Sequence, residues 1–86
     1  MKEIRYVITD ELGLHARPAG LLVKEASRYP CAVTVGVNGG APVDAKRILG
    51  VMKLAAKQGM ELTLTFDGPD EEAAAAALAE FLQANL

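Results

Sequence analysis

Residues 60–66 read Met-Glu-Leu-Thr-Leu-Thr-Phe, a strict alternation of apolar and polar side chains. A period of two is typical of a β-strand with one buried face, because successive side chains of a strand point to opposite sides of the sheet. The pattern places Met60, Leu62, Leu64 and Phe66 together on the buried side. It therefore predicts a sheet with one face against a core.

Three other segments also indicate strands. Residues 3–9 alternate in the same way, and residues 31–38 are rich in β-branched side chains. The Asn-Gly-Gly sequence at residues 38–40 is a strong hairpin signal, because these residues tolerate the left-handed backbone of a tight turn. We therefore expect residues 41–44 to return as a short antiparallel strand.

Three segments have helical spacing. In residues 16–28, apolar side chains recur every three to four positions, and Pro18 stands in the first turn, where its missing N–H costs little. Residues 46–57 indicate a shorter helix that ends at Gly59. Helix-start signals at residues 67–72 precede an alanine-rich helix that runs to the C-terminus. The expected core stripes of the first and last helices are Ala19, Leu22, Val23 and Ala26, and Ala74, Leu78, Phe81 and Leu82.

The predicted order of elements is βαββαβα, with no linker and no internal repeat. Helices of this amphipathic kind cover one face of an antiparallel sheet. We expect residues 1–86 to form a single α+β domain, in which three helices cover one face of a four-stranded sheet.

Composition excludes several classes of function. A formal net charge of −2 argues against a general nucleic-acid binder, which needs a cationic excess. A single cysteine and a single histidine leave too few ligands for the usual zinc sites, so we expect no metal or cofactor, and Cys31 is interpreted as a small apolar filler. No apolar run approaches the roughly 20 residues of a membrane span. Charges at Lys2, Glu3 and Arg5 interrupt the place of an export signal, so we expect a cytoplasmic protein.

The only histidine, His15, stands directly before a predicted helix. A helix start offers unpaired backbone N–H groups, here of Ala16 and Arg17, and a partial positive charge that attracts anions. The Arg17 guanidinium can add a forked contact to phosphate oxygens. The same positive charge disfavours a protonated imidazole, which leaves the ring as a nucleophile. A capping or surface histidine would give the same pattern without any chemistry.

Residues 13–19, Gly-Leu-His-Ala-Arg-Pro-Ala, resemble the active-site signature of the HPr family. Its members are histidine-containing phosphocarriers of the bacterial phosphoenolpyruvate-dependent sugar phosphotransferase system. The resemblance covers the whole chain, through its length, its element order, the Asn-Gly hairpin, the Gly-Val-Met sequence at residues 50–52 and the Lys-Gln-Gly turn at residues 57–59.

The resemblance implies an open-faced β-sandwich and a carrier rather than an enzyme. His15 would accept a phosphoryl group on Nδ1 from enzyme I, and Arg17 would stabilise that group. Enzyme IIA domains of sugar permeases would then receive it. The chain would act as a monomer.

The second helix suggests an interaction surface. Its residues are apolar nearly all the way round, whereas a short helix on a sheet buries only one stripe, so some must be exposed.

In the first helix, Leu21 falls within a row of cationic residues, and an apolar patch with a positive rim suits an acidic partner. A solvated face with scattered apolar residues remains the alternative. In the family this helix pair docks partners, which implies docking roles for Leu21, Lys24, Arg47, Ile48, Leu49 and Met52. We also expect Arg17, Lys24, Arg28 and Arg47 to lie near His15.

One position departs from part of the family. Many members have a regulatory serine at the start of the second helix, where this chain has Arg47. The only serine is Ser27, near the end of the first helix, so seryl control at the second helix is unavailable. The fixed charge of Arg47 is mildly unfavourable at a helix start but suits an acidic partner.

Other functions share parts of this pattern. The nitrogen-related regulatory phosphotransferase branch uses a carrier with the same histidine motif. The βαββαβ order is also that of ferredoxin-like modules, including RNA-binding sheets and ligand-binding regulatory domains. The net charge and the scarcity of aromatic residues disfavour RNA. A regulatory module would leave His15 and Arg17 without a shared purpose.

Overall fold

A computed structural model describes residues 1–86 and has the βαββαβα order that the sequence predicts. The sheet has four antiparallel strands in the order β1-β4-β2-β3. The elements are β1 (Lys2–Val7), α1 (Ala16–Ala26), β2 (Ala32–Val37), β3 (Val43–Asp44), α2 (Ile48–Lys53), β4 (Glu61–Asp67) and α3 (Glu71–Asn85). The α+β fold with one open sheet face is confirmed.

Strand β4 occupies the middle of the sheet, where the alternating sequence is most informative. Its residue Leu64 pairs with Ile4 of β1 on one side and with Val35 of β2 on the other. Leu62, Leu64 and Phe66 are fully buried, as the period of two predicts. Met60 lies before the strand and is only partly buried, so its predicted place on the core face is wrong.

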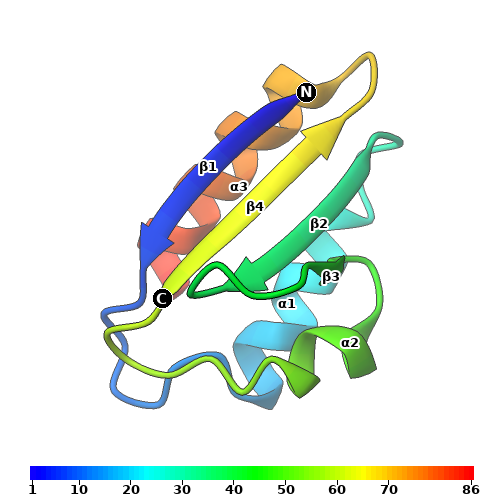
Figure 1. Cartoon of the computed structure of the whole chain (residues 1–86). Coiled ribbons are helices and arrows are strands. Elements are labelled where there is room, and N and C mark those ends of the chain that lie inside the picture. The colour runs from blue at the N-terminus through cyan, green and yellow to red at the C-terminus, as the bar shows by residue number, and fades with distance from the viewer.

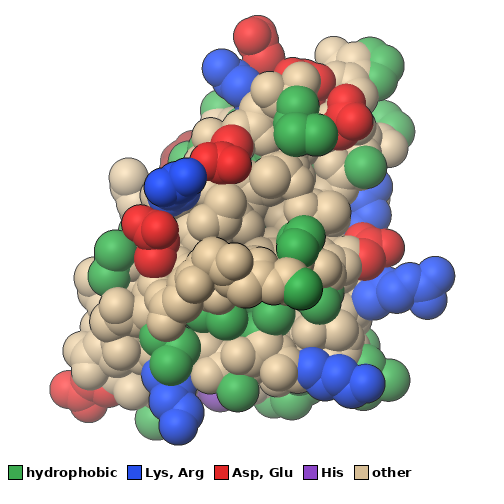
Figure 2. Space-filling view, in the orientation of Figure 1, with side chains coloured by type: hydrophobic (Ala, Val, Ile, Leu, Met, Phe, Trp, Pro, Cys, Tyr) green, Lys and Arg blue, Asp and Glu red, His purple; other side chains and the backbone are tan.

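Helices α1 and α3 lie behind the sheet and its opposite face is open, while the short helix α2 lies beyond β3, beside α1 (Figure 1). Helix α3 packs against β1 and β4, while α1 packs against α3 and α2. Figure 2 shows acidic and basic side chains interleaved over β1 on the open face. Every fully buried side chain is apolar. The predicted helix stripes contribute Ala19, Leu22, Ala26, Ala74, Leu78 and Leu82 to the core, whereas Val23 and Phe81 lie at its margin.

Several elements are shorter than the sequence predicts, and for α2 and β1 the reasons are local. Helix α2 begins at Ile48 because a turn precedes it, in which the Asp44 carboxylate accepts the Lys46 N–H at 2.9 Å. It ends before Ala55, whose φ of 49° breaks the helical backbone. Strand β1 stops at Val7 because the Thr9 N–H leaves the sheet and donates to the Leu86 carbonyl at 2.6 Å.

Cys31 packs in the core with 2% of its surface exposed, as expected of a small apolar filler. Burial and a hydrogen bond with the Asp70 side chain raise the pKa of its thiol, which keeps the sulfur protonated and unreactive. No helix combines the length and the apolar character needed to cross a lipid bilayer.

Candidate functional site

His15 is the N-cap residue of α1 and has an exposed side chain. Its backbone is extended, with φ −88° and ψ −174°, and its carbonyl accepts the Ala19 N–H at 2.9 Å. The imidazole makes no capping hydrogen bond. His15 therefore starts the helix through its backbone alone, and both nitrogens of its ring remain available to another molecule.

The loop before His15 is hydrogen-bonded to the turn that follows α2. The Leu14 N–H donates to the Ala56 carbonyl at 2.9 Å, and the Leu14 side chain is only 5% exposed. The His15 N–H donates to the Gly13 carbonyl at 3.1 Å. An exposed reactive side chain thus stands on a loop whose backbone is fixed on either side.

The first turn of α1 presents two backbone donors without partners. The N–H groups of Ala16 and Arg17 make no hydrogen bond within the chain, as is normal for a helix start. The next residue, Pro18, has no N–H to offer. These two amides, at the positive end of the helix, are the groups from which the sequence predicts an anion site beside His15.

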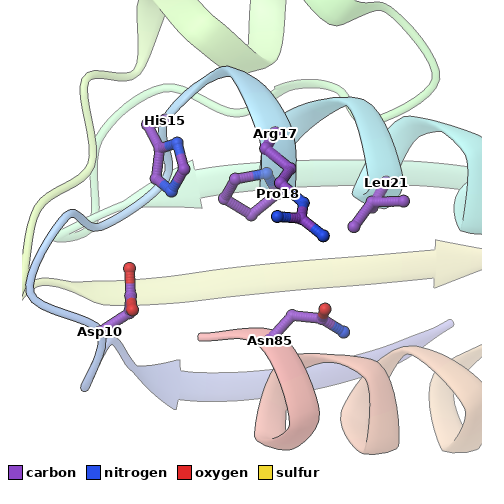
Figure 3. A pocket seen from close by; sticks show the side chains of 6 residues that line it. All are labelled: Asp10, His15, Arg17, Pro18, Leu21 and Asn85. Atoms are coloured by element: carbon purple, nitrogen blue, oxygen red, sulfur yellow. The ribbon is translucent and has the colours of Figure 1, made fainter.

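A pocket of about 160 Å³ opens beside His15 (Figure 3). Its lining residues are Asp10, His15, Arg17, Pro18, Leu21 and Asn85. His15, Arg17 and Leu21 belong to the α1 side, whereas Asp10 and Asn85 face them from the β1–α1 loop and the end of α3. The structure therefore brings the predicted nucleophile and the predicted guanidinium to one small, polar concavity.

Sequence reasoning missed Asp10 and Asn85. Asp10 stood in a segment interpreted only as a loop, and Asn85 approaches from the other end of the chain. What joins them is the Leu86 carbonyl, which accepts the N–H of Thr9 at 2.6 Å, the N–H of Asp10 at 2.8 Å and the Thr9 hydroxyl at 2.8 Å. No local pattern signals this contact between residues so far apart in sequence.

The predicted docking residues lie on α1 and α2, which pack against each other. Leu21 is 41%, Ile48 38%, Met52 43% and Leu49 74% exposed, whereas Val51 is the one buried residue of α2. Lys24 and Arg47 are exposed at the same helix pair. Arg47 lies 3.7 Å from the Asp44 carboxylate, so its charge is partly matched within the chain.

One predicted placement is wrong. Arg28 does not lie near His15, because it follows Arg17 by eleven residues, about 16 Å along a helix. It pairs instead with Glu25 at 3.3 Å and lines a groove between α1 and α3 with Tyr29 and Phe81. Of the four cationic residues expected near His15, only Arg17 lines the pocket beside it.

The chain is thus a small open-faced α+β sandwich with an exposed histidine at a helix start, beside two open amides and an arginine. The family model described as the PTS HPr component phosphorylation site matches residues 2–84. The chain belongs to this family, the phosphocarrier HPr proteins of the phosphotransferase system, so the predicted resemblance is confirmed.

Relatives agree in sequence and in structure. Phosphocarrier protein HPr of Pseudomonas aeruginosa is 45% identical over 82 residues, which cover 95% of this chain and 91% of that protein. A crystal structure of HPr from Thermoanaerobacter tengcongensis superposes with a TM-score of 0.90 at 39% identity, covering 98% of this chain and 93% of the other. A second structure from that organism, described as an HPr dimer, gives a TM-score of 0.75 at 39% identity, with coverage of 98% and 95%.

Proposed function

We propose that this protein carries a phosphoryl group on His15 between two other proteins of the sugar phosphotransferase system. The observation that supports the proposal most is the shared pocket, in which the exposed imidazole lies beside Arg17 and the open amides of Ala16 and Arg17. Each of these groups interacts more favourably with a dianionic ligand than with a neutral one.

The proposed reaction is a reversible exchange of one N–P bond for another. His15 Nδ1 attacks the phosphorus of the phosphohistidine of enzyme I, the donor N–P bond breaks, and the donor imidazole leaves. Its electron pair stays with the donor ring, so no oxidant, metal or water takes part. The amides of Ala16 and Arg17, with the Arg17 guanidinium, offset the charge on the phosphoryl oxygens. Enzyme IIA then takes the group by the same exchange.

The pocket lining suits carriage. It has one nucleophile, His15, and its one carboxylate, that of Asp10, accepts the Leu12 N–H through Oδ2 in the loop turn. A carrier must hold the phosphoryl group without hydrolysing it. The remaining machinery belongs to the partners, and the chain acts on them as a monomer.

Exposed apolar residues of α1 and α2 form the proposed docking surface, which comprises Leu21, Lys24, Arg47, Ile48, Leu49 and Met52. Leu49 is the most exposed of its apolar members, at 74%. Residues that are apolar and exposed beside Lys24 and Arg47 suit a partner with an acidic rim and an apolar centre. The surface adjoins His15 through Leu21, which lines both the pocket and the helix pair.

The phosphoryl step is tested by incubation with phosphoenolpyruvate and a catalytic amount of enzyme I, followed by intact mass measurement. We expect an acid-labile addition of one phosphate to the wild type and none to His15→Ala. Absence of the addition in the wild type, or its persistence in His15→Ala, overturns the proposal. Subsequent addition of a sugar-specific enzyme IIA should discharge the phosphorylated protein, which separates the sugar branch from the nitrogen-related branch.

The docking surface is tested with Leu49→Ala and a matched control, Val7→Ala. Val7 is an apolar residue of β1 that is 50% exposed and distant from α2 in the fold. We expect Leu49→Ala to weaken binding of enzyme I about tenfold, as for an apolar contact at the centre of an interface. Val7→Ala should leave binding unchanged. Equal effects would remove α2 from the interface.

A further inference from the structure

We propose that Asp10 raises the transfer potential of the phosphoryl group on His15 by placing a fixed negative charge in the same pocket. This inference rests on the proposed function of His15. The inference concerns transfer of the phosphoryl group from His15 to the acceptor protein, because a carrier that stabilises its phosphorylated form too strongly does not pass the group on.

The position of Asp10 is fixed by three hydrogen bonds. Its N–H donates to the Leu86 carbonyl at 2.8 Å, and its own carbonyl accepts the Gly13 N–H at 3.0 Å. Carboxylate oxygen Oδ2 accepts the Leu12 N–H at 3.2 Å, which closes a turn within the loop. Asp10 therefore holds its side chain in a defined place at the rim of the pocket.

The carboxylate of Asp10 has no cationic partner. The four ion pairs of the chain join other residues, and none includes Asp10. Figure 3 shows the Asp10 side chain opposite the α1 residues, below His15 and across the pocket from Arg17. A side chain that makes an internal ion pair would present little net charge to the pocket, but this one retains its charge.

The pocket has two charged side chains, Asp10 from the β1–α1 loop and Arg17 from α1, and α3 contributes only the neutral Asn85. In the resting protein these two charges balance. A phosphoryl group on His15 adds nearly two negative charges, so Arg17 attracts it and Asp10 repels it. Repulsion acts on the phosphorylated form alone, and so it shifts the exchange toward the acceptor.

The magnitude follows from Coulomb's law. Between charges that line one solvent-exposed pocket, repulsion of this kind changes an equilibrium constant by about three- to tenfold. That change is small enough to leave carriage intact and large enough to measure. The exchange itself needs no further reactant, since one N–P bond forms as the other breaks and Asp10 neither gains nor loses a proton in the step.

The test compares Asp10→Asn with Glu11→Gln. Asparagine retains an oxygen that accepts the Leu12 N–H, so the turn survives while the charge is lost. Glu11 is the adjacent acid, exposed and absent from the pocket lining, so its variant removes the same net charge from a neighbouring position. Asp10→Ser is a second uncharged variant, whose hydroxyl can also accept the turn hydrogen bond.

Each protein is equilibrated with phosphorylated enzyme I, and the phosphorylated fraction is measured by intact mass. We expect Asp10→Asn and Asp10→Ser to raise the equilibrium constant for phosphorylation about three- to tenfold, and Glu11→Gln to change it less than about twofold. The difference should shrink as salt rises to about 1 M, because screening weakens a charge effect and leaves a structural one.

The outcomes separate the two proposals. If the wild type accepts no phosphoryl group, the proposed function fails. If the wild type is phosphorylated and the Asp10 variants match Glu11→Gln, the carrier stands and the role of Asp10 is overturned. A gain that persists unchanged at high salt also overturns it, because a rearranged loop rather than a lost charge would then be responsible.

Discussion

A methyl group placed on Gly13 would lie 2.5 Å from the carbonyl oxygen of Ala56. The same position has a φ of +65°, which an L-residue rarely adopts. Glycine is therefore required at position 13 for two reasons: its backbone angle, and the close approach of the turn that follows α2. The position of His15 depends on that approach.

We expect Gly13→Ala to lower the free energy of unfolding by about 2–4 kcal/mol, since steric overlap with the Ala56 carbonyl adds to the cost of the left-handed backbone. The control is Gly39→Ala, which has a φ of +74° and no atom within 4 Å of the added methyl. It should lose only about 1–2 kcal/mol. Urea unfolding of both variants measures the difference. Equal losses would show that the contact with Ala56 is not tight.

Arg17 is predicted to matter for the phosphoryl group and not for the fold. Its side chain is exposed and makes no ion pair within the chain, so Arg17→Ala should change the free energy of unfolding by less than about 0.5 kcal/mol. Loss of a charged donor from the pocket should slow phosphoryl acceptance about tenfold or more.

The control for Arg17 is Arg28→Ala, in the turn that follows the same helix and outside the pocket. Both variants lose one positive charge, so any general effect of net charge on the encounter with enzyme I appears in both. Transfer measured by rapid mixing and intact mass should be slow only in Arg17→Ala. Unchanged transfer in that variant would remove Arg17 from the mechanism.

The sequence predicts the strands and helices well wherever burial imposes a period. Leu62, Leu64 and Phe66 alternate with polar residues because one face of β4 is buried against the core and its other face is open. The place of His15 and Arg17 at the start of α1 was also predictable, because it depends on local helix signals alone. These features depend on short-range pattern and on one element at a time.

The remaining features leave no local sequence pattern. Asn85 reaches the pocket because the Leu86 carbonyl accepts hydrogen bonds from Thr9 and Asp10. Arg28 lies away from His15 because the length of α1 separates the two residues, and it pairs with Glu25. The early end of α2 at Ala55 is a backbone angle that alanine does not signal.

Ala55 provides a test of local strain. Its φ of 49° lies in the left-handed region that favours glycine, directly after the C-cap residue Leu54 of α2. We expect Ala55→Gly to raise the free energy of unfolding by about 1 kcal/mol. The control is Ala76→Gly, the same change at an exposed site inside α3, which should lower it by about 1 kcal/mol. Destabilisation by both changes would contradict the strained backbone at Ala55.

The pH dependence of stability is expected to include the ion pair between the Met1 amine and Glu71, whose atoms lie 3.0 Å apart. The amine, through a hydrogen bond, lowers the pKa of the Glu71 carboxyl from its ordinary 4.5, and the Gly68 N–H adds to the effect. The hydrogen bond with Glu71 raises the pKa of the amine above its ordinary 8.0. The pair's contribution is therefore fully present between these two ordinary values, is lost in acid as Glu71 protonates, and is lost in alkali as the amine deprotonates.

Glu71→Gln should accordingly be less stable than the wild type near neutral pH. The difference should vanish in acid, where Glu71 is protonated, and narrow in alkali, where the Met1 amine is neutral but the hydrogen bond from the Gly68 N–H remains. Glu72→Gln is the matched control, because Glu72 is the adjacent acid of the first turn of α3 and makes no ion pair. Its difference from the wild type should vary little with pH. Urea midpoints measured from acid to alkaline pH decide between the two patterns. A Glu71→Gln difference that stays constant across the range would mean that the pair with the Met1 amine does not form in solution.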